Sequence, residues 1–218
     1  MLAILLLSSQ IEAASRFWEE GGWETKEFAQ LKKVFPNIHD AVKLKAVVLN
    51  ALYGTNVFAI DKVGDHLENT IVAPHSSGPE LVEELVSEIK QITKRNHYSF
   101  VAKYAHFFIG SEFPILDWYA EYMVGKHLGP AQSKNPKRYL KFVEDVQKLK
   151  ELAGLTCDCA QLDAYLWVAG EYWYWKEHPT VEINADLKAQ FERLERNPED
   201  EQTLAALLGI ALSTLSGA

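Results

Sequence analysis

The chain has 218 residues, a hydrophobic content of 48% and a formal net charge of −8 at pH 7, so it is long enough to bury one sizeable core. The negative charge argues against a protein that coats nucleic acid or an anionic membrane nonspecifically, because such binding draws on summed positive charge. The charge is uneven, since residues 94–150 carry ten Lys and Arg against five Asp and Glu. A local basic face is therefore compatible with the sequence.

The first fifteen residues contain an apolar run followed by small residues, as a signal peptide does. They lack the positively charged start of a signal peptide, and the run is too short to span a bilayer. We interpret this stretch as a buried or partner-covered first helix. The two cysteines, Cys157 and Cys159, are too few for a disulfide framework, and a bridge between them would be strained. A reducing, cytoplasmic setting is therefore expected.

Apolar residues recur at spacings of three and four along most of the chain, which is typical of amphipathic helices, and no run of strict alternation indicates a strand. Pro79 and Pro136 fit the first turn of a helix. The sequence therefore predicts an all-α protein, a single globular domain of about ten helices with a core over about residues 23–178 and an appended C-terminal helical hairpin over about 180–218. The predicted helices cover about residues 2–14, 23–34, 38–53, 56–69, 79–93, 98–109, 117–128, 136–154, 160–176, 184–195 and 198–215.

The stretch 96–129 is predicted to form a helix, a tight turn, an extended piece and a second helix. Four aromatic residues recur at helical spacing and should form a buried stripe on the first helix: Phe100, Tyr104, Phe107 and Phe108. Gly110 is expected to end that helix. Pro114 disfavours the α conformation of the residue before it, so the chain should cross in an extended form until Asp117 opens the next helix. Position alone makes Asp117 an N-cap.

This stretch, with "FPILD" followed by a helix, resembles the second half of the core of the helix-hairpin-helix DNA glycosylases, and looks like their MutY-type and endonuclease III-like members. In that superfamily an extended segment closes on an essential Asp, which the resemblance places at Asp117. Residues 45–67 resemble, more weakly, the early helix pair of the same superfamily. There the resemblance leaves Leu52 or Tyr53 in the place of the residue that such enzymes insert into the DNA stack.

Two features depart from the pattern of that superfamily. The hairpin, normally Gly-x-Gly, falls at residues 95–99, which contain no glycine. Bifunctional members carry a Lys eighteen residues before the Asp, and Ser99 stands at that position, as a Ser does in MutY-type enzymes. The resemblance thus implies a monofunctional enzyme without a Schiff-base amine. Lys103 follows one helical turn later and is interpreted as a surface lysine.

The resemblance implies a site built around Asp117 and Ser99. An ionised carboxylate lowers the barrier to breaking an N-glycosidic bond, because it stabilises the oxocarbenium-like sugar or activates a water. A flipped base needs flat apolar walls and a few polar groups, for which the candidates are Tyr53, Leu52, Trp118, Tyr122, Lys103 and His106. Phosphate contacts are expected from Lys94, Arg95, Lys134, Lys137 and Arg138.

The leading hypothesis is a monofunctional DNA glycosylase-like hydrolase of base excision repair, acting on a damaged or mispaired base flipped out of double-stranded DNA. The alternative is a noncatalytic helical DNA- or protein-binding module that kept Asp117 as a helix cap. We expect no membrane partner and no cofactor. No metal is expected either, because no histidine pair shows ligand spacing and two thiols cannot hold a closed site alone. The lesion and the oligomeric state are left open.

Overall fold

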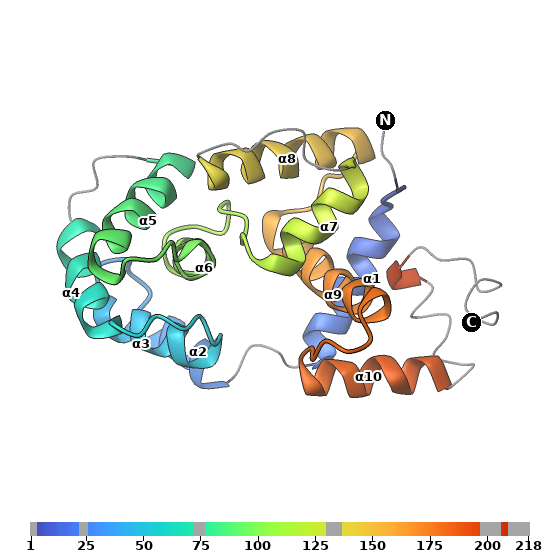
Figure 1. Cartoon of the computed structure of the whole chain (residues 1–218), viewed down its shortest axis with the longest axis horizontal. Helices are drawn as coiled ribbons and strands as arrows, with labels where there is room; N and C mark the ends of the chain where they lie inside the picture. The colour runs from blue at the N-terminus through green and yellow to red at the C-terminus, as the bar shows by residue number, and fades with distance from the viewer. Residues whose placement is uncertain (1–3, 22–25, 72–76, 130–136, 197–205, 209–218) are drawn as a thin grey trace. The chain divides into compact units, whose positions relative to one another are not determined.

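The computed structural model describes residues 4–21, 26–71, 77–129, 137–196 and 206–208. Regular structure within these ranges is helical, and they contain no strand (Figure 1). The predicted all-α class is therefore confirmed. The labelled helices are α1 (Ser8–Gly21), α2 (Lys26–Val34), α3 (Val42–Leu52), α4 (Ile60–Ile71), α5 (Pro79–Thr93), α6 (Tyr98–Phe108), α7 (Trp118–Leu128), α8 (Arg138–Ala153), α9 (Cys159–Glu177) and α10 (Ala185–Arg196). The helix expected over 198–215 lies outside the described residues except for 206–208.

Local chemistry at the helix ends explains why several boundaries agree closely with the prediction. α5 begins at Pro79, directly after Gly78, whose φ of 60° favours glycine. α9 begins with a capping box, in which the Asp158 carboxylate accepts a hydrogen bond from the Gln161 amide at 2.8 Å and the Gln161 side chain accepts one from the Asp158 amide at 3.2 Å. Both signals are readable from short stretches of sequence.

The first helix is the clearest error among the predicted boundaries. α1 begins at Ser8, and residues 4–7 are not helical. The Gln10 side chain accepts a hydrogen bond from the Leu7 amide at 2.8 Å, and the carbonyl of Ile4 accepts one from Nδ1 of His127 at 2.9 Å. These contacts hold residues 4–7 in a nonhelical form. An uninterrupted apolar run specifies no helical face, so its pattern does not distinguish this form from a helix. The helix instead continues through Gly21, beyond the predicted end.

The chain is organised as two compact units. Unit 1 comprises Met1–Gly22, Trp118–Gln132 and Asp145–Ala218, and unit 2 comprises Trp23–Asp117 and Ser133–Glu144. α8 begins in unit 2 and continues into unit 1. Asp117 is therefore the last residue of the long segment of unit 2, whose helices supply its neighbours.

The core of unit 1 is built on α9, which packs against α1 and α7. Gly170 permits a close approach between α9 and α7, because a Cβ at this position would lie only 2.6 Å from the backbone oxygen of Tyr119. Aromatic rings fill much of the rest. Phe191 of α10 stacks on Phe17 at 6.1 Å between ring centroids and contacts the ring of Tyr172 at 5.1 Å.

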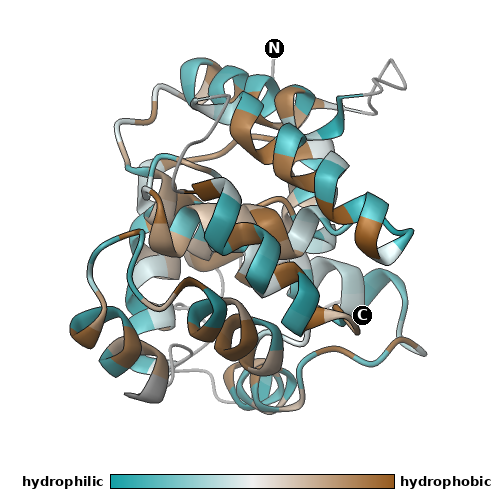
Figure 2. Cartoon of the chain, turned by 90° about the vertical axis from the view of Figure 1, so that its left-hand side faces the viewer, coloured by the Kyte–Doolittle hydropathy of each residue, from teal (hydrophilic) through white to brown (hydrophobic). Residues whose placement is uncertain are grey.

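The core of unit 2 surrounds α6. α3 packs against α4 and α6, and α5 packs against the same two helices. Eight of the eleven residues of α6 are buried, so this helix has almost no solvent face. The helices around it are amphipathic, and Figure 2 shows hydrophilic and hydrophobic residues alternating around the ribbons.

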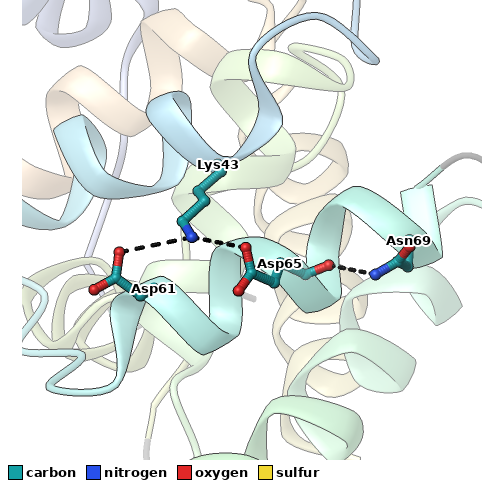
Figure 3. A network of polar contacts seen from close by, with 4 residues as sticks. All are labelled: Lys43, Asp61, Asp65 and Asn69. Carbon is teal, nitrogen blue, oxygen red and sulfur yellow. Dashed lines mark hydrogen bonds and ion pairs between the residues drawn. The ribbon is translucent and has the colours of Figure 1, made fainter.

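One polar network of unit 2 lies on the surface where α3 meets α4. The amino group of Lys43 lies between two carboxylates, 2.7 Å from Asp65 and 3.8 Å from Asp61, and the amide of Asn69 donates to the backbone oxygen of Asp65 (Figure 3). Gly64 lies directly beneath the stem of this lysine, since a Cβ there would be 2.7 Å from Cγ of Lys43. Close packing thus brings the two helices together under an exposed ion-pair network.

Candidate active site around Asp117

The segment that leads to Asp117 begins at the end of α6. The amides of Ile109 and Gly110 both donate to the carbonyl of Ala105, at 2.9 and 3.0 Å, which closes the last turn of the helix. The carbonyl of Gly110 then accepts a hydrogen bond from the amide of Phe113 at 3.2 Å. The helix therefore ends two residues before Gly110, close to the predicted position, and the chain turns before it extends toward α7.

Two buried side chains hold the extended segment in place. His106 Nδ1 lies 2.8 Å from the carbonyl oxygen of Phe113, and since that oxygen can only accept, Nδ1 carries the hydrogen. The hydroxyl of Tyr139 donates to the carbonyl of Pro114 at 3.0 Å. Two consecutive backbone carbonyls are thus fixed by α6 and α8. This arrangement anchors the segment that leads to Asp117.

The carboxylate of Asp117 forms an ion pair with Lys103. The amino nitrogen of Lys103 lies 3.0 Å from Oδ2 of Asp117 and 3.0 Å from Oγ of Ser99. The side chains of the pair are only 11% and 13% exposed. Forming a pair this far removed from water costs desolvation free energy. Removing one partner is also costly, because the other charge is then left buried without an opposite charge beside it.

The interpretation of Lys103 as a surface lysine is wrong. Lys103 lies on the buried face of α6, and its amino group turns to Asp117 rather than to solvent. Ser99 is one turn earlier on the same helix, so the two side chains share a face. The structure therefore brings together Ser99, Lys103 and Asp117, all three of which were predicted site residues.

The turn between α5 and α6 closes without glycine. Lys94 follows the last residue of α5 and adopts the left-handed conformation, with φ of 62°, which is a position that favours glycine. The hydroxyl of Thr93 supports the turn, since it accepts a hydrogen bond from the Arg95 amide at 3.3 Å. A helix, a four-residue turn and a second helix are thus present, although the glycines that the resemblance calls for are absent.

Several of the predicted phosphate contacts gather at this turn. Lys94 and Arg95 lie in it and are exposed, and the guanidinium of Arg138 lies over the ring of Tyr98 at 5.8 Å, with Lys137 next to it in the chain. Burial and the charge of Arg95 lower the pKa of His97, so the turn favours a neutral imidazole. Lys134 lies outside the described residues. Four of the five basic candidates are therefore close to the start of α6.

Glu83 of α5 organises the same region, and sequence reasoning did not identify it. One of its carboxylate oxygens accepts hydrogen bonds from the amides of Tyr139 and Leu140, at 2.6 and 3.3 Å, and so serves the start of α8. The other oxygen accepts from the hydroxyl of Tyr98 at 2.9 Å, and burial with this bond raises the pKa of Tyr98 to about 12. No local pattern marks these partners, because they lie far apart in the sequence.

The upstream loop after α3 is held by Asn50. Its side-chain oxygen accepts hydrogen bonds from the Thr55 hydroxyl at 2.8 Å and from the Val57 amide at 2.9 Å. Tyr53 does not project from this loop, because its ring packs against Phe28 and Phe107 at 5.4 and 5.2 Å.

Two large apolar side chains near this loop are exposed instead: Leu52, the last residue of α3, and Phe58 within the loop. Phe58 was not among the sequence candidates, and it is 85% exposed. Of the two residues proposed for insertion into DNA, Leu52 is thus the more accessible.

Trp118 and Tyr122 belong to unit 1 and share a neighbour, Tyr174 of α9. Trp118 is 56% exposed, and its ring meets the ring of Tyr174 edge-on at 5.9 Å. Tyr122 contacts the same ring at 5.5 Å and donates its hydroxyl to Glu177 at 2.5 Å, while burial raises its pKa. Trp118 therefore presents an aromatic face to solvent in unit 1, whereas the hydroxyl of Tyr122 is occupied by Glu177.

The part of the chain that the structure describes contains neither a cluster of metal ligands nor a helix that could span a membrane. None of the described His, Cys, Asp and Glu side chains forms a group of three that could hold a metal ion. None of the described helices is both long and apolar enough to cross a membrane. Cys157 lies just before α9 and Cys159 is its first residue; neither forms a disulfide, and burial raises the pKa of each thiol. These thiols are therefore poor nucleophiles near neutral pH.

Comparison with known proteins gives one partial match. A family model named HI_0787_N, described as an N-terminal domain, matches residues 10–112, just under half of the chain. The match covers α6 with Ser99 and Lys103, and it stops before Asp117. Searches of curated proteins and of solved structures give no match. The chain is therefore similar to this N-terminal domain over residues 10–112.

Proposed function

We propose that the protein is a DNA glycosylase-like hydrolase, which cleaves the N-glycosidic bond of a damaged or mispaired base with Asp117 as the carboxylate at the sugar. One observation carries the proposal: Asp117 ends a segment fixed at two carbonyls and lies in a poorly hydrated position next to Lys103 and Ser99. The resemblance of residues 96–129 to the glycosylase core supports the same assignment.

The proposed reaction suits a carboxylate in such a position. Departure of the base leaves positive charge on the sugar, and a fixed carboxylate stabilises that charge without having to reorganise. The low exposure of Asp117 strengthens this effect, because water screens it less. The rigid attachment of the segment keeps the carboxylate where the charge develops.

The basic residues at the α5–α6 turn support DNA as the partner. Lys94, Arg95, Lys137 and Arg138 would contact phosphates on one side of the duplex, whereas the chain as a whole is acidic. Replacing Lys94 and Arg95 by Glu should weaken DNA binding and flatten its dependence on salt, since the slope of log K against log salt falls by about 0.9 for each phosphate that the protein no longer neutralises. An unchanged slope would remove the turn from the DNA-binding surface.

Base release from defined duplexes tests the proposal. The purified chain is incubated with duplexes that carry uracil, 8-oxoguanine, adenine opposite 8-oxoguanine, or an alkylated base, and abasic sites are then counted. We expect release from at least one duplex by the wild-type chain. Asp117→Asn should abolish that release, whereas Asp61→Asn, a change in the exposed network of Figure 3, should retain it.

The alternative of a noncatalytic binding module also has an observation in its favour. Lys103 already neutralises Asp117, and the turn that should approach DNA lacks glycine. Under this alternative every duplex binds or fails to bind without losing a base, and Asp117→Asn affects folding only. Release of a base that depends on Asp117 rules this alternative out.

A further inference from the structure

We propose that Glu83 is a positioning residue for Asp117: it fixes the start of α8, and α8 fixes the segment that ends at Asp117. The contacts run from Glu83 to Tyr139 and from Tyr139 to Pro114, and all of these residues belong to unit 2. The inference rests on the proposed function, because it assigns Glu83 and Tyr139 to the same reaction. Neither residue was among the candidates from the sequence.

The start of α8 is held by side chains from other helices. The first amides of a helix have no partner within it, and the first turn of α8 contains no acidic residue of its own. Glu83 supplies a carboxylate from α5, and one of its oxygens accepts from the amides of Tyr139 and Leu140 at 2.6 and 3.3 Å. The backbone of Arg138 hydrogen-bonds to the hydroxyl of Tyr98, which donates to the other oxygen of Glu83 at 2.9 Å. Glu83 and Tyr98 thus hold the first residues of α8.

Tyr139 carries this constraint to the segment before Asp117. It is 0% exposed, and its hydroxyl donates to the carbonyl of Pro114 at 3.0 Å. Asp117 follows Pro114 by three residues. A closely packed interior transmits a displacement rather than absorbing it. A shift at the start of α8 would therefore reach the carboxylate of Asp117.

The second anchor of the segment does not involve Glu83. His106 of α6 donates from Nδ1 to the carbonyl of Phe113 at 2.8 Å, so it fixes the segment relative to α6. Tyr139 fixes the segment relative to α8 and, through Glu83, relative to α5. Loss of the contacts of Glu83 leaves the anchor at His106 in place. The expected result is a displaced carboxylate in a folded protein.

The carboxylate of Glu83 also links the site to the basic residues proposed to contact DNA. Tyr98, which donates to Glu83, begins α6, and the guanidinium of Arg138 lies over its ring at 5.8 Å. Because Arg138 is also the first residue of α8, a phosphate bound by Arg138 would be held in a fixed relation to Asp117. Catalysis by positioning requires the DNA backbone and the catalytic carboxylate to be aligned in this way.

Single-turnover base release at saturating DNA tests the inference, at a temperature where every variant is folded. Saturation removes differences in affinity, so the rate reports the chemical step. Glu83→Ala and Tyr139→Phe should each lower this rate roughly 10-fold or more, because a small misplacement of a catalytic group is costly. Glu83→Gln keeps an acceptor oxygen for the two amides of α8 and should recover most of the rate. Tyr139→Phe should leave the dissociation constant for DNA unchanged.

Two matched variants control for a general loss of stability. Glu84→Ala changes the next residue of α5, whose buried Oε2 has no hydrogen-bond partner among the described residues. Tyr165→Phe removes a buried hydroxyl of unit 1 that lies 3.0 Å from His127, just as Tyr139→Phe removes one at 3.0 Å from its acceptor. Both controls should release the base at the wild-type rate. A loss in the controls equal to that in Glu83→Ala and Tyr139→Phe would overturn the inference.

A double variant shows whether Glu83 acts through Tyr139. Both single changes interrupt the same series of contacts, so Glu83→Ala combined with Tyr139→Phe should be no slower than Glu83→Ala alone. A rate reduced by the product of the two single effects would show independent actions and overturn the inference. If Glu83→Ala does not fold, Glu83→Asp takes its place, because it keeps the charge and withdraws it from α8.

Hydrogen exchange of residues 109–117, followed by mass spectrometry, gives a readout that does not require base release. Exchange should be faster in Tyr139→Phe and Glu83→Ala and unchanged in the two controls. Wild-type rates of base release in Tyr139→Phe and Glu83→Ala would overturn the inference and leave the glycosylase proposal standing. If no duplex loses a base, faster exchange in these two variants alone would support the positioning and count against the glycosylase. Unchanged exchange in that case would overturn both.

Discussion

Two of the lysine–aspartate pairs described in unit 2 have similar geometry in different surroundings. The amino group of Lys103 lies 3.0 Å from Asp117, and that of Lys43 lies 2.7 Å from Asp65. The side chains of the first pair are 11% and 13% exposed, and those of the second are 40% and 60% exposed (Figure 3). A surface pair contributes little to stability, whereas a buried pair binds each charge to the other. Similar distances between the charged atoms therefore do not imply similar contributions to stability, because the two pairs differ in burial.

The largest expected effect comes from removing one partner of the buried pair. Lys103→Met leaves Asp117 charged in a poorly hydrated place and should lower the free energy of unfolding by about 3 kcal/mol. Lys43→Met, the matched change in the surface pair, should lower it by about 0.5 kcal/mol. Urea denaturation at neutral pH measures both. Equal losses would show that burial does not separate the two pairs.

A buried histidine of unit 1 gives a second test of how burial affects a charged group, because burial favours its neutral form. His127 is 0% exposed, and its ring nitrogens pair with the carbonyl of Ile4 and the hydroxyl of Tyr165. Burial lowers its pKa below the ordinary 6.5. The unfolded chain therefore binds the proton more readily, so stability should fall as the pH drops below about 6.5.

The corresponding experiment measures urea denaturation at pH 7.5 and 5.5. His127→Gln should reduce the loss of stability between these values by about 1 kcal/mol, since one pKa unit corresponds to about 1.4 kcal/mol. A pH dependence that the substitution leaves unchanged would assign the loss to other groups.

The substitution Gly64→Ala tests the close packing of α4 against the side chain of Lys43. Gly64→Ala places a Cβ 2.7 Å from Cγ of Lys43, which should cost about 1 kcal/mol as the lysine stem moves. Combining it with Lys43→Ala should recover part of that loss, because the crowded Cγ is then absent. A double variant as unstable as the sum of the two single variants would contradict this explanation.

The substitution Lys94→Gly should have the smallest effect on stability, and it should stabilise the protein where the other substitutions destabilise it. Lys94→Gly relieves a left-handed conformation, with φ of 62°, and should raise stability by about 0.5 kcal/mol. The same change removes a charge from the α5–α6 turn and should weaken DNA binding. Thermal denaturation and a binding titration at fixed salt measure the two results. Lower stability would show that the turn does not strain this residue.

The fold was largely predictable from local signals. The bounds of α5 agree with the prediction because Pro79 and the apolar period lie within the segment itself, and the start of α9 is set by Asp158 and Gln161. The first helix was misplaced because a run of leucines carries no periodic information. Local signals thus predicted most of the helices. They did not predict the start of α1, where the apolar run has no helical period.

The candidate site was predictable only in part. Asp117, Ser99 and Lys103 could each be singled out from the sequence, but their meeting depends on the path of residues 109–117. That path is fixed by His106 and Tyr139, and the role of Tyr139 depends on the packing of a helix distant in sequence. Lys103 was interpreted as a surface residue because lysine usually is one. Tertiary structure overrode that expectation.

The rate of base release in a single turnover by the wild-type chain and by Asp117→Asn tests the central claim most directly. The comparison uses the duplex that the wild-type chain processes best, at a temperature where both proteins are folded. We expect the substitution to slow release by about 100-fold or more, because the charge that stabilises the sugar is lost. An equal rate for the two proteins, or no release from any duplex by the wild-type chain, would contradict the assignment of Asp117.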